Sequence, residues 1–221
     1  MLKKIYVTEF EMELLSGLHI GGSSDSFDIG GADSTVIKNP LTNEPYIPGS
    51  SIKGKLRALL TQKYGVLNHN KTNIEFANDQ SGKILLNIFA PVEFDENNIQ
   101  VTKAIFRDAY LTEDSKNMLE MQLGPGIFTE IKAENSINLL NGTAANPRFI
   151  ERVPAGVKFV GEIILQVYDG DNEDAMKAGI NEALDLLELN YIGNSGTRGY
   201  GRVKISKIKD MQEVKFWYEN I

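Results

Sequence analysis

Hydrophobic and polar residues alternate along several stretches of the chain, and this pattern predicts β-strands. Residues 157–167 show it most clearly, because every second position from Val157 to Val167 is apolar or glycine. Residues 3–14 also alternate, but their phase slips by one residue near Thr8, which predicts a β-bulge. Three further stretches carry the β-branched and aromatic bias of strands: 101–111, 203–208 and 214–218.

Two other stretches have apolar residues at helical spacing. They are residues 51–64 and residues 173–189, and the second has acidic residues in its first turn. Taken in order, the regular elements follow the sequence β-α-β-β-α-β. This is the ferredoxin-like (RRM-like) plan of the α+β class, with helices on one face of an antiparallel sheet. We expect a single domain over residues 1–221 with long insertions at approximately 17–48, 66–100 and 112–153.

The segments between these elements are polar or rich in glycine. Residues 23–31 predict a long exposed loop, and residues 66–81 an irregular segment. Residues 83–89 predict a short helix that ends before Pro91. Residues 127–152, which follow a Gly-Pro-Gly turn, contain too little apolar surface for a core and predict an extended insertion. We expect the 23–33 and 127–148 segments to be partly disordered without a ligand.

Composition and charge narrow the function classes. With 42% hydrophobic and 24% charged residues, the chain is an ordinary globular protein. It has no apolar run of membrane-spanning length, and its first residues enter a strand pattern rather than a signal peptide, so we expect a cytoplasmic protein with no membrane partner. The lack of cysteine excludes disulfides, and only two histidines are present, which argues against a structural zinc site. The net charge of −7 argues against an overall positive field but leaves room for a locally basic groove.

The start of the first predicted helix gathers groups that bind anions. Pro48 and Gly49 interrupt the preceding segment, and a serine can then cap the helix. No acid occurs between residues 51 and 63, so backbone donors, hydroxyls and cations meet without a competing carboxylate. The stretch therefore predicts phosphate binding. The side chains concerned are Ser50, Ser51, Lys53, Lys55 and Arg57.

This phosphate-binding stretch is not a nucleotide-binding P-loop. Residues 49–55 fit the pattern G-x-x-x-x-G-K, but the next residue is Leu56, which cannot hold a magnesium ion as Ser or Thr does. The segment before it contains three prolines and is no buried parallel strand. A nucleoside triphosphatase is thereby excluded, and the backbone of a nucleic acid is the remaining phosphate source.

Two further features suit contact with RNA. Arg198 lies among four glycines between residues 193 and 201, where the backbone can approach a ligand and the guanidinium can make a forked contact. That loop follows a helix and precedes a strand, the reverse of a dinucleotide fingerprint, and a flexible turn is its alternative interpretation. His19 lies near glycines as well, and it can be either a structural hydrogen-bonded residue or an RNA contact.

Seven motifs in a fixed order carry a family resemblance. They are GLHIGG, DS-VIK-P, PYIPGSSIKGKLR, RDA, TE-K-EN-I, NPR-IERVPAG and LL-YIG-SGTRGYGRV, spread from Gly17 to Val203. In this order they resemble the RAMP superfamily of CRISPR-associated proteins. More narrowly, they are similar to the backbone subunit of the type III-A (Csm) effector complex, the third in that series.

The resemblance implies a set of roles. Copies of such a subunit polymerise along a CRISPR guide RNA, beside other Csm subunits, and present the guide to a single-stranded target RNA. Asp33 matches the family's catalytic aspartate in the cleavage of target RNA at regular intervals, with Mg²⁺ or Mn²⁺ as cofactor. The helix start at residues 50–57 and the loop at 193–201 match guide contacts, and residues 127–152 match a thumb-like hairpin. The implied RNA-binding residues are His19, Ser50, Ser51, Lys53, Lys55, Arg57, Arg148 and Arg198.

Three interpretations of this chemistry remain open at this level. Asp33 can bind the metal, or it can orient the 2′-hydroxyl or act as a base. An aspartate is also common in turns, and Ala32 and Thr35 depart from the family's usual neighbours, so a non-catalytic RNA-binding subunit of the same complex is the alternative. A nuclease that processes guide precursors through a His-centred, metal-independent site is the third.

Overall fold

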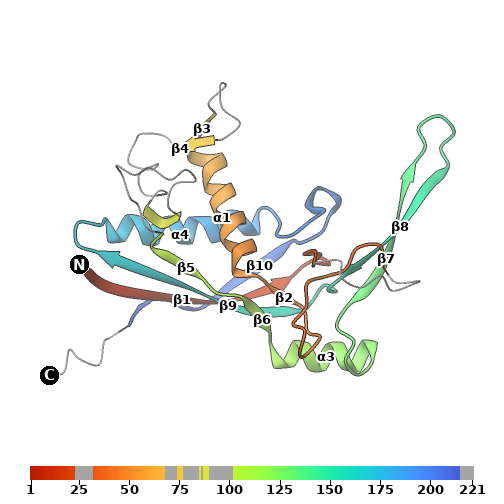
Figure 1. Cartoon of the computed structure of the whole chain (residues 1–221), viewed down its shortest axis with the longest axis horizontal. Helices are drawn as coiled ribbons and strands as arrows, with labels where there is room; N and C mark the ends of the chain where they lie inside the picture. Colours follow the sequence, from red (N-terminus) through yellow and green to blue (C-terminus); the bar gives the residue numbers. More distant parts are fainter. Residues whose placement is uncertain (23–31, 68–73, 77–84, 86, 90–101, 215–221) are drawn as a thin grey trace.

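The computed structural model describes residues 1–22, 32–67, 74–76, 85, 87–89 and 102–214 (Figure 1). Several sequence predictions fall wholly or partly outside this range. They are the glycine-rich loop at 23–31, most of the irregular segment at 66–81 and almost all of the final strand at 214–218. Of the short helix predicted at 83–89, residues 85 and 87–89 are described and are helical.

A mixed α/β arrangement surrounds one main antiparallel sheet. Its three long strands are β1 (Leu2–Leu14), β9 (Lys158–Tyr168) and β10 (Val203–Glu213). The strand order is β10-β1-β9-β6-β2, and β5 also pairs with β9. The short strands are β2 (Tyr46–Ile47), β5 (Ala104–Phe106) and β6 (Ala109–Leu111).

Two predictions about individual strands can be compared with this sheet. The bulge predicted in β1 near Thr8 is wrong: from Tyr6 to Leu14 every second residue of β1 is buried, and its register with β9 does not shift there. The register between β1 and β10 does shift on both sides of Glu9, but the extra residues lie in β10. The continuous strand predicted over 101–111 is wrong, since the stretch is divided into β5 and β6. At the break, the Arg107 amide donates to the Glu162 carbonyl, and the Asp108 carboxylate accepts from the Gly49 amide instead of facing a neighbouring strand.

One face of the sheet carries the core. Along β9 and from Tyr6 to Leu14 of β1, buried residues alternate strictly with half-buried ones, and the buried apolar residues join one cluster with apolar residues of helices α1 (Gly49–Tyr64) and α4 (Glu173–Glu188). The two helices also contact each other. α1 and α4 therefore cover the same face of the sheet, as the periodicity predicted. None of the helices in the described ranges is long and apolar enough to cross a membrane.

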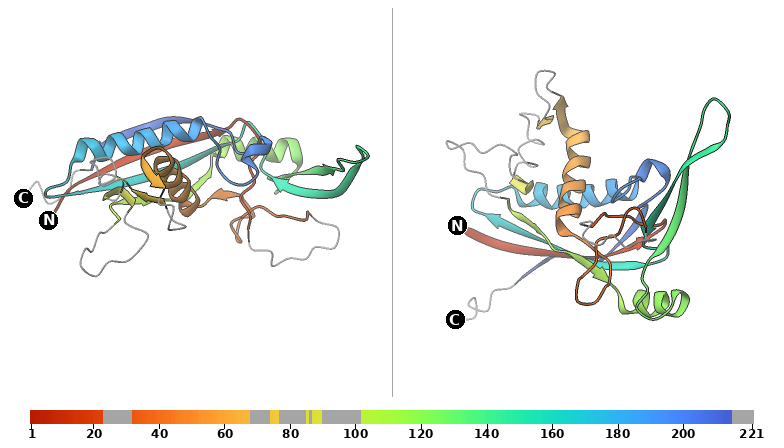
Figure 2. Two further views of the ribbon diagram at one scale, coloured as in Figure 1. Left: turned by 90° about the horizontal axis from the view of Figure 1, so that it is seen from above. Right: turned by 45° about the vertical axis from the view of Figure 1, so that its right-hand side comes forward.

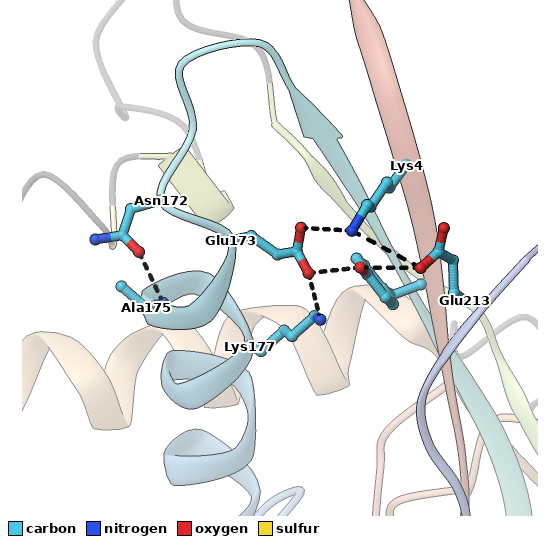
Figure 3. A network of polar contacts seen from close by, with 7 residues as sticks. Lys4, Asn172, Glu173, Ala175, Lys177 and Glu213 are labelled. Atoms are coloured by element: carbon cyan, nitrogen blue, oxygen red, sulfur yellow. Dashed lines mark hydrogen bonds and ion pairs between the residues drawn. The ribbon is translucent and has the colours of Figure 1, made fainter.

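A polar network fastens α4 to the sheet (Figure 3). Glu173, in the first turn of α4, pairs with Lys4 of β1 and with Lys177 one helical turn later, and it accepts a hydrogen bond from the Tyr6 hydroxyl. Lys4 also reaches Glu213 of β10. The Lys177 and Tyr6 hydrogen bonds lower the pKa of the Glu173 carboxyl to about 2.

The low pKa of Glu173 predicts a pH-dependent contribution to stability. The ionised carboxylate stabilises the fold above the unfolded-state pKa of about 4.5, and this contribution disappears as the pH falls towards 2. Glu173→Gln should therefore lower Tm by about 2–4 °C at pH 7, a modest value because the network is partly solvated, and by progressively less below pH 4. Asp174→Asn, in the same helical turn, is the control. Equal Tm losses for Glu173→Gln at pH 3 and pH 7 would contradict the assignment.

The insertion before β9 consists of a helix and a hairpin. Helix α3 (Glu113–Leu123) was not predicted, although its N-terminus has the usual capping residues. The Thr112 side chain accepts a hydrogen bond from the Ser115 amide, and two acidic residues occupy the first turn. Strands β7 (Glu130–Ile137) and β8 (Ala144–Arg152) then form a separate two-stranded sheet. Figures 1 and 2 show this hairpin extending away from the main sheet, so the predicted thumb-like hairpin is observed. A small pair, β3 (Gly65–Leu67) and β4 (Ile74–Phe76), lies at the far end of α1.

A candidate RNA-binding cleft with an exposed aspartate

A cleft of about 820 Å³ lies between the hairpin, the segment after residue 32 and the glycine-rich loop. It brings together four of the site residues that the sequence predicted, from positions up to 179 residues apart: His19, Asp33, Arg148 and Arg198. Two arginines and two asparagines line it together with serines and few apolar groups. Its full lining is His19, Asp33, Ser34, Asn146, Pro147, Arg148, Ile150, Asn194, Ser195 and Arg198.

Asp33 is fixed at the edge of β8. Its amide donates to the Phe149 carbonyl (2.8 Å), and its carboxylate oxygen Oδ2 accepts from the Phe149 amide (2.7 Å). The side chain nevertheless remains exposed. No donor among the described residues bonds the second oxygen, Oδ1. One carboxylate oxygen is therefore used to hold the residue in place, while Oδ1 has no hydrogen-bond donor among the described residues, and Asp33 lines the cleft.

The residues after Asp33 are anchored by the buried carboxylate of Glu151. It accepts from the Val36 amide (2.8 Å), the Lys38 ammonium (2.5 Å) and the Thr129 hydroxyl (2.5 Å). Burial raises the pKa of the Glu151 carboxyl, but the hydrogen bonds from these three donors outweigh it, so the pKa lies below its usual value. Glu151 thus stays ionised and ties the Asp33 segment to β8 and to the base of the hairpin.

His19 takes the structural role that the sequence left open. It is 3% exposed, and its Nδ1 lies 2.6 Å from the Glu151 carbonyl oxygen, so Nδ1 carries the proton and donates. Nε2 lies 3.0 Å from the Ser34 hydroxyl, and the two groups share a hydrogen bond. Both ring nitrogens are engaged by the protein. A direct RNA contact by His19 stays a prediction, since the ring also lines the cleft.

A bulge in β8 directs Arg148 towards the cleft. Arg148 pairs with Glu134 in the hairpin register, whereas the next pair is Ser136 with Ala145, so β8 has one residue more than β7 between these pairs. Asn146, within the bulge, has a φ of 53°, which a non-glycine side chain seldom adopts. Such bulges re-aim side chains, and here both Arg148 and Asn146 line the cleft.

The glycine-rich loop forms the opposite wall. It contains a short 3₁₀ helix, η1 (Gly196–Arg198), preceded by Ser195 in the left-handed region with a φ of 61°. Arg198 donates to the Ser195 hydroxyl (2.6 Å) and forms a 3.4 Å ion pair with Glu134 of the hairpin. A β-carbon on Gly196 would come within 1.9 Å of the Tyr191 ring. The glycine is thus required by close packing against Tyr191.

Two aromatic residues that the sequence did not single out support this wall. The Tyr191 ring lies under Gly196 and carries the Lys55 ammonium 3.6 Å from its centroid, which connects α1 to the loop. Tyr200 is buried, with Lys132 over its ring at 4.6 Å and Arg152 at 5.3 Å. Burial and the nearby Glu134 carboxylate raise the pKa of Tyr200 to about 12. Both tyrosines occur in the glycine-rich motif, where their spacing to the glycines was the available signal.

The start of α1 differs from the predicted phosphate site. The expected cap by Ser50 or Ser51 is wrong: Pro48 is the N-cap residue, and no side chain of its own caps the helix. Instead the Asp108 carboxylate accepts from the Gly49 amide at 2.7 Å. A carboxylate of the protein therefore occupies the anion-binding end of the helix.

The cations of α1 do not line the cleft. Lys53, Lys55 and Arg57 are half-buried and Ser50 is exposed, and all lie outside the cleft lining. Burial lowers the pKa of the Lys55 ammonium and of the Arg57 guanidinium below their usual values. Lys55 reaches the cleft's surroundings through the ring of Tyr191. RNA contact by these residues stays a prediction.

The uncovered face of the main sheet is unsuited to phosphate. Glu9 of β1 lies opposite Glu162 of β9, and each is paired outwards, Glu9 with Lys209 and Glu162 with Arg107. Glu11 and Glu13 follow on the same face of β1. A polyanion would meet a row of carboxylates there, whereas the hairpin cleft offers two exposed arginines.

The cleft has few ligands for a metal ion. Within the described ranges, no group of three or more His, Asp or Glu side chains is placed to hold one. Among the residues that the structure describes, Asp33 is the only carboxylate in the cleft lining. With these residues, a hard divalent cation would need further oxygens, such as RNA phosphates, in its remaining positions.

Comparison with known proteins identifies the family. Residues 11–204 match the sequence model of the RAMP superfamily. The chain belongs to the RAMP superfamily. It is 41% identical over 203 residues to "CRISPR system Cms endoribonuclease Csm3" of Streptococcus thermophilus, a match that covers 90% of this chain and 86% of the relative. A protein of the same name from Methanocaldococcus jannaschii is 38% identical over 222 residues, covering 99% of this chain and 85% of the relative.

Solved structures show the same relationship. The chain is similar, with a TM-score of 0.53 and 25% identity, to one in a crystal structure of a Csm3–Csm4 subcomplex of the type III-A CRISPR-Cas interference complex, over all of this chain and 94% of that one. A cryo-EM structure of the type III-B Cmr-beta bound to cognate target RNA contains a chain with a TM-score of 0.62 at 20% identity. That match covers 94% of this RAMP chain and 62% of the other, and it shows the fold alone.

Proposed function

We propose that the chain is a guide-RNA-binding backbone subunit of a type III-A CRISPR interference complex and that it cleaves complementary target RNA at regular intervals. One observation carries the proposal: an exposed aspartate is held by two backbone hydrogen bonds in a cleft that also presents two arginines. The endoribonuclease names of relatives about 40% identical over most of the chain support it. Assembly with other copies, with further Csm subunits and with guide and target RNA follows from this role, and we place the assembly in the cytoplasm with the transcripts it would meet.

The core that supports the cleft follows, we infer, the ferredoxin-like plan in a single domain over residues 1–221. The chain order β1, α1, β5 with β6, β9, α4, β10 supports this, as does the antiparallel strand order β10-β1-β9-β6. The cleft is then built mainly by the insertions at approximately 17–48 and 112–153 and by the loop before the last strand. The insertion at 66–100 lies largely outside the described residues.

The two arginines are suited to the RNA backbone. The side chain of Arg198 is 57% exposed, and its ion pair with Glu134 is long at 3.4 Å, so a phosphate can replace the carboxylate at little cost. Arg148 is exposed on the opposite wall. Forked contacts from both sides would fix the strand across Asp33.

Asp33 would act on the sugar-phosphate linkage in one of two ways. Its Oδ1 can accept the proton of a 2′-hydroxyl as that oxygen attacks the neighbouring phosphorus; the bond to the 5′-oxygen of the next nucleotide then breaks, that oxygen takes a proton from water, and a 2′,3′-cyclic phosphate remains. Alternatively, Asp33 can bind Mg²⁺ or Mn²⁺ together with phosphate oxygens of the RNA. When bound, such a cation would stabilise the charge that develops on the phosphate. The arginines orient the linkage in both cases. Because Asp33 is the single carboxylate that the described residues bring to the cleft, the free chain should hold the metal weakly.

Mapping of cut sites tests this function. A complex assembled from this chain, its Csm partners and a guide RNA should cut an end-labelled complementary RNA at evenly spaced positions when Mg²⁺ or Mn²⁺ is present, and EDTA should stop the cutting. A non-complementary RNA is the control. Tight target binding without cuts would favour the non-catalytic alternative, for which the Ala32 and Thr35 departures are the motivation. EDTA-resistant cutting of the guide precursor would instead favour a processing nuclease.

A further inference from the structure

Phe149 is an exposed aromatic residue in direct contact with the proposed catalytic aspartate. Its amide and carbonyl make the two hydrogen bonds that hold Asp33, at 2.7 and 2.8 Å. Its side chain is 47% exposed. Among the described residues its ring has no aromatic or cationic neighbour. A large apolar side chain is therefore presented to solvent at a fixed position next to the Asp33 carboxylate.

The two faces of the hairpin differ in chemistry at this point. Alternation along β8 puts Arg148 and Phe149 on opposite faces. Arg148 lines the cleft, whereas Phe149 shares its face with Ala133, directly opposite on β7, and with Ile131 two residues away. Asp33 lies at the edge of β8 between the two faces. An RNA strand can place one phosphate at Arg148 and the adjoining sugar at Asp33. Its next base would then lie at the edge of β8, beside the ring of Phe149.

We propose that Phe149 stacks on the target-RNA base beside the linkage that Asp33 cuts, and so positions that linkage. The inference rests on the proposed function and names one more residue for it. Proteins read single-stranded and unstacked RNA through bases stacked on aromatic rings, with cations nearby for the backbone. Arg148 and Phe149 supply these two contacts from adjacent positions. Because the amide of Phe149 also holds Oδ2 of Asp33, the base platform and the carboxylate move as one unit.

RNA fits this position better than the alternative occupant, a second protein copy. A protein contact would use the outer hairpin face as a whole, including Ile131 and Ile137, which are 59% and 69% exposed. The ring of Phe149, however, is the one aromatic group on that face of the described strands and the one whose backbone binds Asp33. An aromatic ring and a backbone bonded to Asp33 both suit a nucleotide held at the cut site, whereas a protein partner requires neither.

The test uses the assembled complex with guide RNA. Target strands carry 2-aminopurine in turn at each nucleotide that flanks a cut, and fluorescence and cutting rate are measured at saturating target. We expect quenching of one position by the wild-type complex. In Phe149→Leu, which keeps an apolar side chain, that quenching should be lost and cutting should slow about 10-fold. Phe149→Tyr, which keeps the ring, should restore both.

Two controls separate stacking from other roles. An abasic target nucleotide at the same position should slow the wild-type complex as much as Phe149→Leu does, and combining both changes should have no added effect. Ile131→Ala, on the same face, should leave cutting unchanged. Equal defects in Ile131→Ala and Phe149→Leu would assign the face to protein contact and overturn the proposal, as would normal cutting and quenching in Phe149→Leu. The 2-aminopurine signal is also measured in an Asp33→Ala complex, so that stacking is tested independently of cutting. A lack of cutting by the wild-type complex would contradict the proposed function. Fluorescence that Phe149→Leu leaves unchanged would contradict the role of Phe149.

Discussion

Replacing Asp33 by alanine should reduce target-RNA cleavage by at least about 100-fold, because the carboxylate in the cleft is lost whether it acts as a base or as a metal ligand. Asp33→Asn is the sharper variant. The amide oxygen can still accept from the Phe149 amide, which now bonds Oδ2 at 2.7 Å, so the loop stays anchored while the charge disappears. Both variants should retain guide binding and target binding. Single-turnover cleavage of labelled target by assembled complexes gives the rates.

A matched acid elsewhere controls for general effects of lost charge. Asp210 of β10 is exposed and pairs with Lys207, outside the cleft lining. Asp210→Asn should cut at the wild-type rate. If Asp33→Asn also cut at the wild-type rate while Asp33→Ala did not, the aspartate would act only by holding the Phe149 amide, and the non-catalytic interpretation of this residue would stand.

The second large effect concerns the two cleft arginines. Arg148→Ala and Arg198→Ala should each weaken target-RNA binding about five- to tenfold, and each should reduce the slope of log K against log salt by about 0.7–0.9, the value for one lost phosphate contact. Arg198→Lys should recover the slope but not the full affinity, since a lysine keeps the charge without the forked geometry. Filter binding or fluorescence anisotropy between 50 and 200 mM salt measures both quantities.

Arg107 provides a matched arginine for this experiment. Its side chain is 61% exposed and pairs with Glu162 at 3.5 Å, close to the 57% and 3.4 Å of Arg198 with Glu134, but it lies at the uncovered face of the sheet. Arg107→Ala should leave the affinity and the salt slope unchanged. Equal losses for Arg107→Ala and Arg198→Ala would show that RNA binding depends on overall charge and not on the cleft.

The sequence predicted the fold where periodicity is strong. The alternation over 157–167 and the helical stripe of 173–189 correspond to β9 and α4, because both elements bury one face against the same core. Helix α3 was missed because its apolar content is low and its capping signal is local. The break between β5 and β6 depends on the bond from Gly49 to Asp108, 59 residues apart, which no local pattern encodes.

The candidate site was predictable only in part, because some of its contacts join residues that are far apart in the sequence. Motif resemblance singled out Asp33, His19, Arg148 and Arg198, and the fold brings all four to one cleft. Phosphate binding by the α1 residues was predicted from the local cations and serines alone. The carboxylate that occupies the helix start belongs to Asp108, which lies between β5 and β6. Phe149 carries no local signal, since an aromatic residue in a strand is most often part of a core. Its role depends on which face of β8 is covered.

The central claim is that each copy of the chain makes one cut with its own Asp33. Complexes assembled on one guide RNA from mixtures of wild-type and Asp33→Asn subunits test this directly. We predict that every cut weakens in proportion to the fraction of variant subunits, while the positions and the spacing of the remaining cuts stay the same. Cuts that persist at full intensity with variant subunits alone would contradict the account.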